Sequence, residues 1–274
     1  MGAICIHGKP PQFQTETLPT FVAGLPELDV HTLREDWALG TSLVNHWELL
    51  AQSLGLKPSE WIDTKGDRMY GAVVYLNTWF DLDDIIREDD EFTAETTFLG
   101  IRKPHALSRT EFKVGGKVKA RVEILSSFIK RVQKGSNKKF SRVRDLWTAE
   151  DYGTDAIDAL LDLHHENKQI PDMGDVASSQ EINRITDFNT ADFMYFKNYV
   201  RFAKAAEWVA NRGNPVRLNQ TRECFFYGNV DDGQVISTKV GFDGDDFQSS
   251  HHSDDGRRIF LSRGKSLPVQ IAER

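Results

Sequence analysis

The sequence predicts an α+β chain in which a long helix with one apolar face, followed by consecutive antiparallel strands, occurs twice. Apolar side chains recur at helical spacing in residues 42–55 and again in residues 191–211. Each stretch precedes several short segments rich in β-branched and aromatic residues, which favour strands. A chain of 274 residues is long enough for two modest domains, so the repeat is expected to build two similar units.

The first unit is expected to hold one helix and a run of strands. Thr41 or Ser42 can cap the start of the helix, and Gly55 can end it. Gly115-Gly116 is a hairpin turn signal between the last two strands. The strands are expected at residues 68–76, 92–101, 107–112 and 118–129.

The second unit repeats this order. Its helix is expected at residues 191–211, and Asp232-Gly233 marks its first hairpin. Between the units, residues 152–167 have weak helical character and residues 171–180 are expected to form a loop. The strands of the second unit are expected at residues 216–226, 234–242, 247–253 and 257–263.

A long apolar helix followed by antiparallel strands is the order in which a hot-dog unit wraps its sheet around its helix. The fold class is therefore predicted as α+β, a double hot-dog fold with two antiparallel sheets, each wrapped around a long central helix. Two unrelated α+β domains would give the same order of elements. The predicted divisions are an N-terminal arm at 1–30, a first unit at 31–145, a connector at 146–185 and a second unit at 186–274.

Composition excludes several classes of protein. The net charge of −7 argues against nucleic-acid binding, which requires a basic surface. No stretch approaches the ~20 apolar residues that a membrane helix needs. The first eight residues are too short and too weakly apolar for a secretory signal. These observations predict a cytoplasmic protein with no nucleic-acid or membrane partner.

The cysteines and histidines indicate neither a disulfide framework nor a metal site. Cys5 and Cys224 do not form a Cys-x-x-Cys pair, and Cys224 is expected to be a small buried hydrophobic residue. Histidine pairs stand at residues 164–165 and 251–252, without cysteine or carboxylate at zinc-ligand spacing. We therefore expect no metal ion.

Two motifs carry a resemblance to known proteins. Residues 187–199, which read Asp-Phe-Asn-Thr-Ala-Asp-Phe-Met-Tyr-Phe-Lys-Asn-Tyr, resemble the central helix of hot-dog proteins of the acyl-CoA thioesterase type. Residues 45–51, Asn-His-Trp-Glu-Leu-Leu-Ala, and 66–72, Gly-Asp-Arg-Met-Tyr-Gly-Ala, resemble the LnmK-type proteins of polyketide biosynthesis. Residues 41–44 depart from the Gly-His-x-His pattern expected of that family, which puts the roles of the polar residues on the first helix in question.

The LnmK-type resemblance implies a bifunctional acyltransferase/decarboxylase. Such an enzyme takes methylmalonyl from coenzyme A, removes its carboxylate and leaves propionyl on an acyl carrier protein. The implied partners are acyl-CoA and the carrier protein, with a homodimer expected from the family. No cofactor is implied, because the coenzyme A thioester is a substrate and its carbonyl is itself the electron sink. Tyr70 falls where the family has its active-site tyrosine.

Decarboxylation of such a thioester requires stabilisation of the enolate oxygen and limited access of water. Tyr70 either forms a covalent acyl intermediate or donates a hydrogen bond, and the sequence leaves both roles open. His46, Arg68 or Arg109 could take its proton or stabilise its phenolate. The predicted site thus consists of the following residues: catalytic Tyr70 and His46, and substrate-binding Asn45, Ser42, Arg109, Asn189 and Thr190. Ser42 and Asn189-Thr190 are included because they are expected to begin the two long helices, where backbone N–H groups are free.

Two other functions remain open. The chain could be a hot-dog thioesterase or dehydratase of acyl-CoA or acyl carrier protein, with His46 and Asp187 as a dehydratase pair. It could also be a non-catalytic acyl-binding scaffold. The basic stretch at residues 130–144 is either a solvated loop or a surface for coenzyme A phosphates or an acidic carrier protein.

Overall fold

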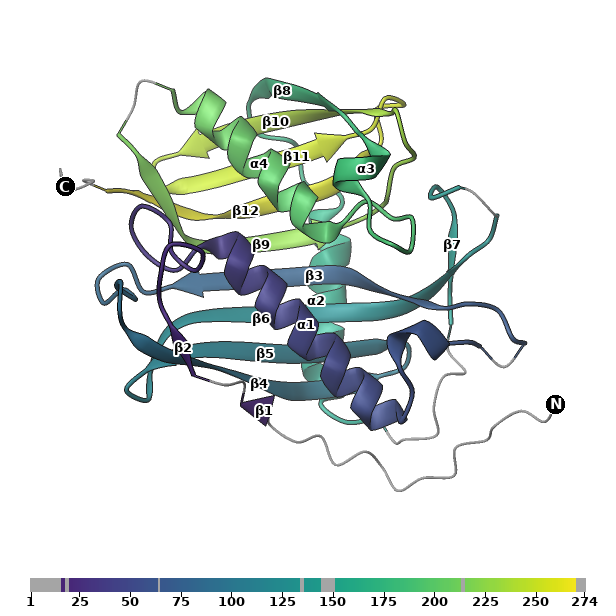
Figure 1. Ribbon diagram of the computed structural model, residues 1–274. Helices are drawn as coiled ribbons and strands as arrows, with labels where there is room; N and C mark the ends of the chain where they lie inside the picture. Colours follow the sequence, from purple (N-terminus) through teal and green to yellow (C-terminus); the bar gives the residue numbers. More distant parts are fainter. Residues whose placement is uncertain are drawn as a thin grey trace.

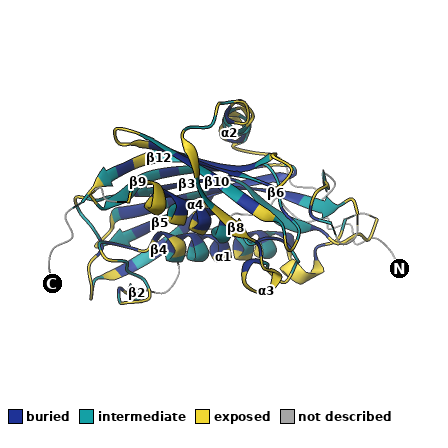
Figure 2. Cartoon of the chain, turned by 90° about the horizontal axis from the view of Figure 1, so that it is seen from above, coloured by how far each residue is buried: buried dark blue, intermediate teal, exposed yellow. Residues whose placement is uncertain are grey.

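The computed structural model describes residues 16–17, 20–63, 65–133, 136–143, 151–212 and 215–269. Its strands form one 12-stranded sheet within these residues. Helices α1 (Glu35–Leu54) and α4 (Phe196–Ala210) lie on one face of this sheet, and α2 (Thr154–Asn167) lies on the other (Figures 1 and 2). None of the helices in the described part of the chain combines the length and apolar character needed to cross a membrane.

The strands of each unit are consecutive in the sequence. In the first unit they are β3 (Tyr70–Phe80), β4 (Glu91–Arg102), β5 (His105–Val114) and β6 (Lys117–Arg131). In the second they are β9 (Arg217–Phe226), β10 (Val235–Asp243), β11 (Asp246–His252) and β12 (Arg258–Pro268). The remaining elements are β1 (Glu16–Thr17), β2 (Phe21–Val22), η1 (Pro58–Glu60), β7 (Phe140–Arg142), β8 (Asp175–Glu181) and α3 (Arg184–Asp187).

The two units meet edge to edge through β3 and β9. These strands pair antiparallel, with Asn77 opposite Glu223 near the middle of the contact. On one side of this seam the strand order is β4-β5-β6-β3, and on the other it is β9-β12-β11-β10. Counted outward from the seam, the strands of each unit follow in the same order: first, fourth, third and second. The units are therefore related by a local two-fold axis at the seam. The predicted double hot-dog fold is confirmed, and all eight predicted strands are present with ends shifted by a few residues. The two sheets expected from the sequence are joined into one, because β3 and β9 pair along the seam.

The structure corrects the expected start of the first helix. Helix α1 begins at Glu35, so Thr41 and Ser42 lie within it and cap nothing. Gly40, just before the expected start, is a poor helix former. Ala38 and Leu39 are nevertheless completely buried, and their packing holds the first two turns in place. The expected end is confirmed, because Gly55 adopts a left-handed φ of 63°.

The expected start of the second helix is also wrong. Helix α4 begins at Phe196, and residues 188–195 form a loop closed by a bridge between Phe188 and Met194. Asp192 has a left-handed φ of 60°, which interrupts a helix at that point. Asn189 and Thr190 therefore do not begin the helix.

The region between the units contains one element that the sequence analysis missed. Residues 171–180 were expected to form a loop, but β8 (Asp175–Glu181) pairs antiparallel with β10. Its sequence, Asp-Val-Ala-Ser-Ser-Gln-Glu, lacks a strand signal because both of its faces are largely solvent-accessible at the sheet edge. The expected helix is present as α2, whose Ile157 is buried with Tyr75 and Phe225 on the outer face of the sheet.

One apolar core extends across the seam. It includes Leu39 of α1, Ala203 of α4, Leu76 of β3 and Cys224 of β9. The predicted burial of Cys224 is confirmed, whereas Cys5 lies outside the described residues. Because both helices pack into the same core, the two units hold each other in a fixed orientation.

Candidate functional site

The structure brings Tyr70 of the first unit against the second unit. Tyr70 begins β3 and is half-buried. Its ring lies 5.0 Å from the ring of Phe193, at an interplanar angle of 83°. The guanidinium carbons of Arg131 and Arg68 lie 5.2 and 5.4 Å from the centre of the Tyr70 ring. The predicted tyrosine therefore lies where the two units meet, between two cations and an aromatic ring.

The loop at residues 188–195 supplies the other side of this contact. The Oδ1 atom of Asn189 accepts hydrogen bonds from the N–H groups of Ala191, at 3.0 Å, and Phe193, at 3.2 Å. Arg131 donates through Nη2 to the carbonyl oxygens of Ala191, at 2.6 Å, and Asp192, at 2.7 Å. Asn189 thus shapes the loop that carries Phe193 onto Tyr70, while Thr190 lies exposed beside it.

His46 is completely buried between α1 and the sheet. Its Nδ1 atom lies 2.7 Å from the hydroxyl of Ser108, and its Nε2 atom lies 2.8 Å from the hydroxyl of Ser126. Burial lowers the pKa of His46 to about 3, so the ring is neutral. Both ring nitrogens are engaged by hydroxyl groups inside the first unit, so His46 is held in place between α1 and the sheet, and its predicted catalytic role stays a prediction.

The proposed pair of His46 with Asp187 is not formed. Asp187 instead accepts a 2.8 Å hydrogen bond from Arg201 and a 2.9 Å hydrogen bond from the N–H of Asn183. The arrangement therefore lacks the histidine–carboxylate contact that a dehydratase would require of these two residues.

His46 predicts a specific dependence of stability on pH. The unfolded state takes up a proton near pH 6.5, whereas the folded state resists protonation until the pH approaches 3. Stability should therefore fall as the pH drops through this window, by about 2 kcal/mol at pH 5 from this residue. Urea unfolding at pH 7 and pH 5 should show a smaller loss for His46→Gln than for the wild type. Equal losses would contradict this account of His46.

Asn45 and Ser42 are buried on the same helix as His46. Asn45 donates from Nδ2 to the hydroxyl of Thr96 at 2.9 Å, and Thr96 in turn lies 2.8 Å from the hydroxyl of Thr110. The hydroxyl of Ser42 and the Oδ1 atom of Asn45 have no hydrogen-bond partner among the described residues. These side chains form a polar layer between α1 and the sheet rather than a helix N-terminus.

Arg109 lies on the other face of the sheet. Ser108 and Thr110, on either side of it in β5, point toward the face of the sheet that α1 covers. Successive side chains in a strand point to opposite faces, so Arg109 points away from α1. Arg109 is paired with Glu123 on β6 at 2.6 Å. The structure therefore separates Arg109 from His46 by the thickness of the sheet.

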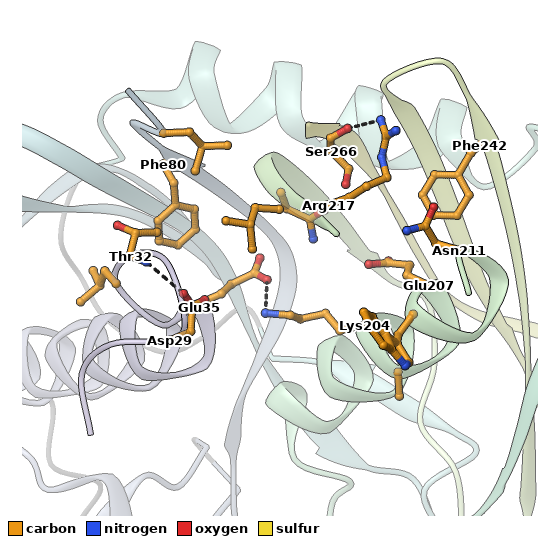
Figure 3. A pocket seen from close by; sticks show the side chains of 16 residues that line it. Asp29, Thr32, Glu35, Phe80, Lys204, Glu207, Asn211, Arg217, Phe242 and Ser266 are labelled. Carbon is orange, nitrogen blue, oxygen red and sulfur yellow. Dashed lines mark hydrogen bonds and ion pairs between the residues drawn. The ribbon is translucent and has the colours of Figure 1, made fainter. Parts of the chain in front are cut away.

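A second site, at the other end of the seam, was missed by the sequence analysis. A cavity of about 380 Å³ lies between the start of α1 and the end of α4. Glu35, Lys204 and Glu207 are among the residues that line it (Figure 3). Arg217, which begins β9 as Tyr70 begins β3, also lines it. The local two-fold axis therefore places this cavity opposite the Tyr70 contact.

A network of buried charges lies beneath this cavity. Arg222 of β9 is completely buried and donates to Glu207 of α4, at 2.7 and 2.9 Å, and to Glu35 of α1, at 3.1 Å. Burial alone would raise the pKa of Glu35, but the charges of Arg222 and Lys204 outweigh it and lower the pKa to about 2. In the sequence, only Arg222 itself indicates this network. It is a charged residue within β9, at a position where the alternation of strand side chains places it on the inner face of the sheet.

Two cations of the basic stretch at residues 130–144, Lys130 and Arg131, bind other parts of the fold. Lys130 lies 2.6 Å from a carboxylate oxygen of Asp63 and 2.6 Å from one of Asp67. Arg131 donates hydrogen bonds to carbonyl oxygens of the 188–195 loop. Lys134 and Arg144 lie outside the described residues. A role of this stretch in binding coenzyme A or a carrier protein stays a prediction.

Comparisons with known proteins agree with the fold. No family model matches the chain, and a search of curated proteins gives no match. A 12:0-ACP thioesterase from Umbellularia californica has 12% sequence identity and a TM-score of 0.66, with 93% of this chain and 98% of that chain covered. An acyl-ACP thioesterase from Bacteroides thetaiotaomicron has 12% identity and a TM-score of 0.62, with 92% and 98% covered.

A third structure, HtdX of Mycobacterium tuberculosis, has 9% identity and a TM-score of 0.54, with 93% of this chain and 100% of that chain covered. The similarity spans both units in each case, because nearly the whole of each chain is aligned. At these identities the comparison establishes the architecture. The chain thus has a double hot-dog fold whose two units share one core and meet along the β3–β9 seam.

Proposed function

We propose that this protein is an enzyme that acts on an acyl group carried as a thioester, and that hydrolysis of the thioester is its reaction. The supporting observation is the match of the whole chain to two acyl-ACP thioesterases, at TM-scores of 0.66 and 0.62. In hydrolysis, water attacks the carbonyl carbon, the carbon–sulfur bond breaks, and the thiol leaves with a proton. The products are a free acid and the thiol of coenzyme A or of a carrier protein.

Decarboxylating acyl transfer is a second candidate, favoured by the surroundings of Tyr70. The substrate would be a methylmalonyl thioester, whose carboxylate could pair with the exposed guanidinium of Arg68. The carbon–carbon bond to the carboxylate breaks, carbon dioxide leaves, and the electron pair forms an enolate that is then protonated. The thiol of the carrier protein then attacks the carbonyl carbon of the propionyl thioester, the carbon–sulfur bond to coenzyme A breaks, and coenzyme A leaves as its thiol with the proton. This reaction needs no general base to activate water.

Tyr70 would serve either reaction in the same way. A phenol donates a hydrogen bond well, and both reactions place negative charge on the thioester oxygen in the transition state. Phe193 of the 188–195 loop covers one side of the ring. We assign Tyr70 as the residue that stabilises this oxygen.

The products distinguish the candidates. The purified protein would be incubated with a saturated acyl-ACP, with the corresponding acyl-CoA, and with methylmalonyl-CoA plus carrier protein carrying a free thiol. Mass spectrometry would then identify the small molecules and the intact carrier protein. Free fatty acid supports hydrolysis, and carbon dioxide with a propionyl adduct on the carrier supports decarboxylating transfer. No change in any substrate would contradict both and favour an acyl-binding scaffold.

A further inference from the structure

A groove with basic side chains runs between α1 and the first half of α4. It encloses about 530 Å³, enough for a small ligand. Lys197, Arg201 and Lys204 of α4 contribute cations to its wall, and Asp36 of α1 is the one carboxylate among its described lining residues. The aromatic rings of Phe188 and Tyr195 line the same groove. A groove of this kind suits an anionic ligand that also has a flat ring.

The three cations of this groove differ in whether they form an ion pair with a carboxylate of the chain. Arg201 lies 2.8 Å from Asp187, and Lys204 lies 3.1 Å from Glu35, so both have a buried counter-charge behind them. Lys197 forms no ion pair or hydrogen bond with any other described residue through its ammonium group. It lies instead over Gly40 of α1, where a Cβ atom would be 3.3 Å from Nζ. The groove therefore carries a part-buried positive charge without an ion-pair partner among the described residues.

We propose that this groove binds the phosphate-bearing nucleotide end of coenzyme A. The proposal rests on the proposed function, since it names the carrier of the acyl group. Phosphate groups would pair with Lys197 and its neighbouring cations, and the adenine ring would pack on Tyr195 or Phe188. Coenzyme A fits better than a carrier protein, because its phosphates and its adenine ring can meet Lys197 and an aromatic ring within one groove.

The groove and Tyr70 are separated by a single loop. Asn189 lines the groove, and the N–H of Asn189 donates to the carbonyl of Phe193 at 2.9 Å. Phe193 packs on Tyr70 on the far side of that loop. A flexible pantetheine arm that starts in the groove can therefore pass the 188–195 loop and present its thioester to Tyr70.

Direct binding tests the proposal without turnover. Isothermal titration calorimetry would compare coenzyme A, dephospho-coenzyme A and pantetheine on the wild type and on Lys197→Met, which keeps the aliphatic stem and removes the charge. Loss of one charge-assisted contact should weaken coenzyme A binding roughly tenfold or more. Pantetheine, which has no phosphate, should bind equally to both proteins. Lys265→Met, at an exposed lysine of β12, is the matched control and should bind coenzyme A as the wild type does.

The outcomes separate this inference from the proposed function. Coenzyme A binding that depends on Lys197 supports the groove even if no thioester is hydrolysed. Equal binding of coenzyme A and pantetheine, or unchanged binding in Lys197→Met, overturns the groove even if hydrolysis is observed. A carrier protein that competes through Lys197 while free coenzyme A does not bind would also overturn it, in favour of a carrier docking site.

Discussion

Replacing Arg222 with Met is expected to lower the free energy of unfolding by about 3–5 kcal/mol. Arg222 is the central cation of a buried network that joins Glu35 of α1 to Glu207 of α4. Without it, two carboxylates remain buried, with Lys204 as the nearest cation to Glu35. Urea unfolding at pH 7 measures the loss, and an unchanged slope of free energy against urea would show that the transition remains two-state.

Two further variants make this result specific. Arg263→Met removes a cation from the half-exposed pair with Glu223, 2.9 Å away, and should cost only about 0–1 kcal/mol. Adding Glu35→Gln and Glu207→Gln to Arg222→Met removes the stranded charges and should restore part of the lost stability. If Arg222→Met and Arg263→Met cost the same, the network does not hold the two helices together.

Replacing Tyr70 with Phe is expected to reduce kcat by roughly 10²–10³-fold. The change removes one hydroxyl and keeps the ring that packs on Phe193. No hydrogen bond joins that hydroxyl to another described residue, so the fold should lose little stability. Steady-state kinetics on the thioester that proves to be the substrate measure the loss, with unfolding curves recorded on the same samples.

The control is Tyr227→Phe, at a tyrosine near α2 whose hydroxyl is buried without a hydrogen-bond partner among the described residues. It should keep full activity. Near-full activity of Tyr70→Phe would remove Tyr70 from the catalytic machinery. Intact-protein mass spectrometry during turnover separates its two roles, because an acyl adduct that is absent in Tyr70→Phe indicates a covalent intermediate and no adduct indicates a hydrogen-bond donor.

Local patterns predicted the strands of this fold well. The Gly115-Gly116 turn is one example: both residues have left-handed φ values, 55° and 80°, which glycine adopts without strain. Strands β5 and β6, on either side of it, lie where alternation and β-propensity put them. These features depend on residues close together in the sequence, so a single sequence contains the necessary information.

The errors come from contacts between distant residues. Residues 191–195 have ordinary helical character, but Arg131, some sixty positions away, binds the carbonyls of Ala191 and Asp192 and holds them in a loop. The contacts of His46 with Ser108 and Ser126 could not be predicted either, because neither serine can be inferred from the helix that carries His46. Tyr70 could be proposed only through a family resemblance, since nothing in β3 indicates that Phe193 lies beside it.

The local two-fold axis at the β3–β9 seam bears on how such a protein can evolve. In a dimer of identical chains, one mutation changes both ends of the seam at once. In a single polypeptide each end can diverge independently, as after a gene duplication. Here one end has Tyr70 and the other has Arg217 at the corresponding strand start. In one polypeptide, the end with Tyr70 and the end with the buried charges between α1 and α4 are therefore free to differ.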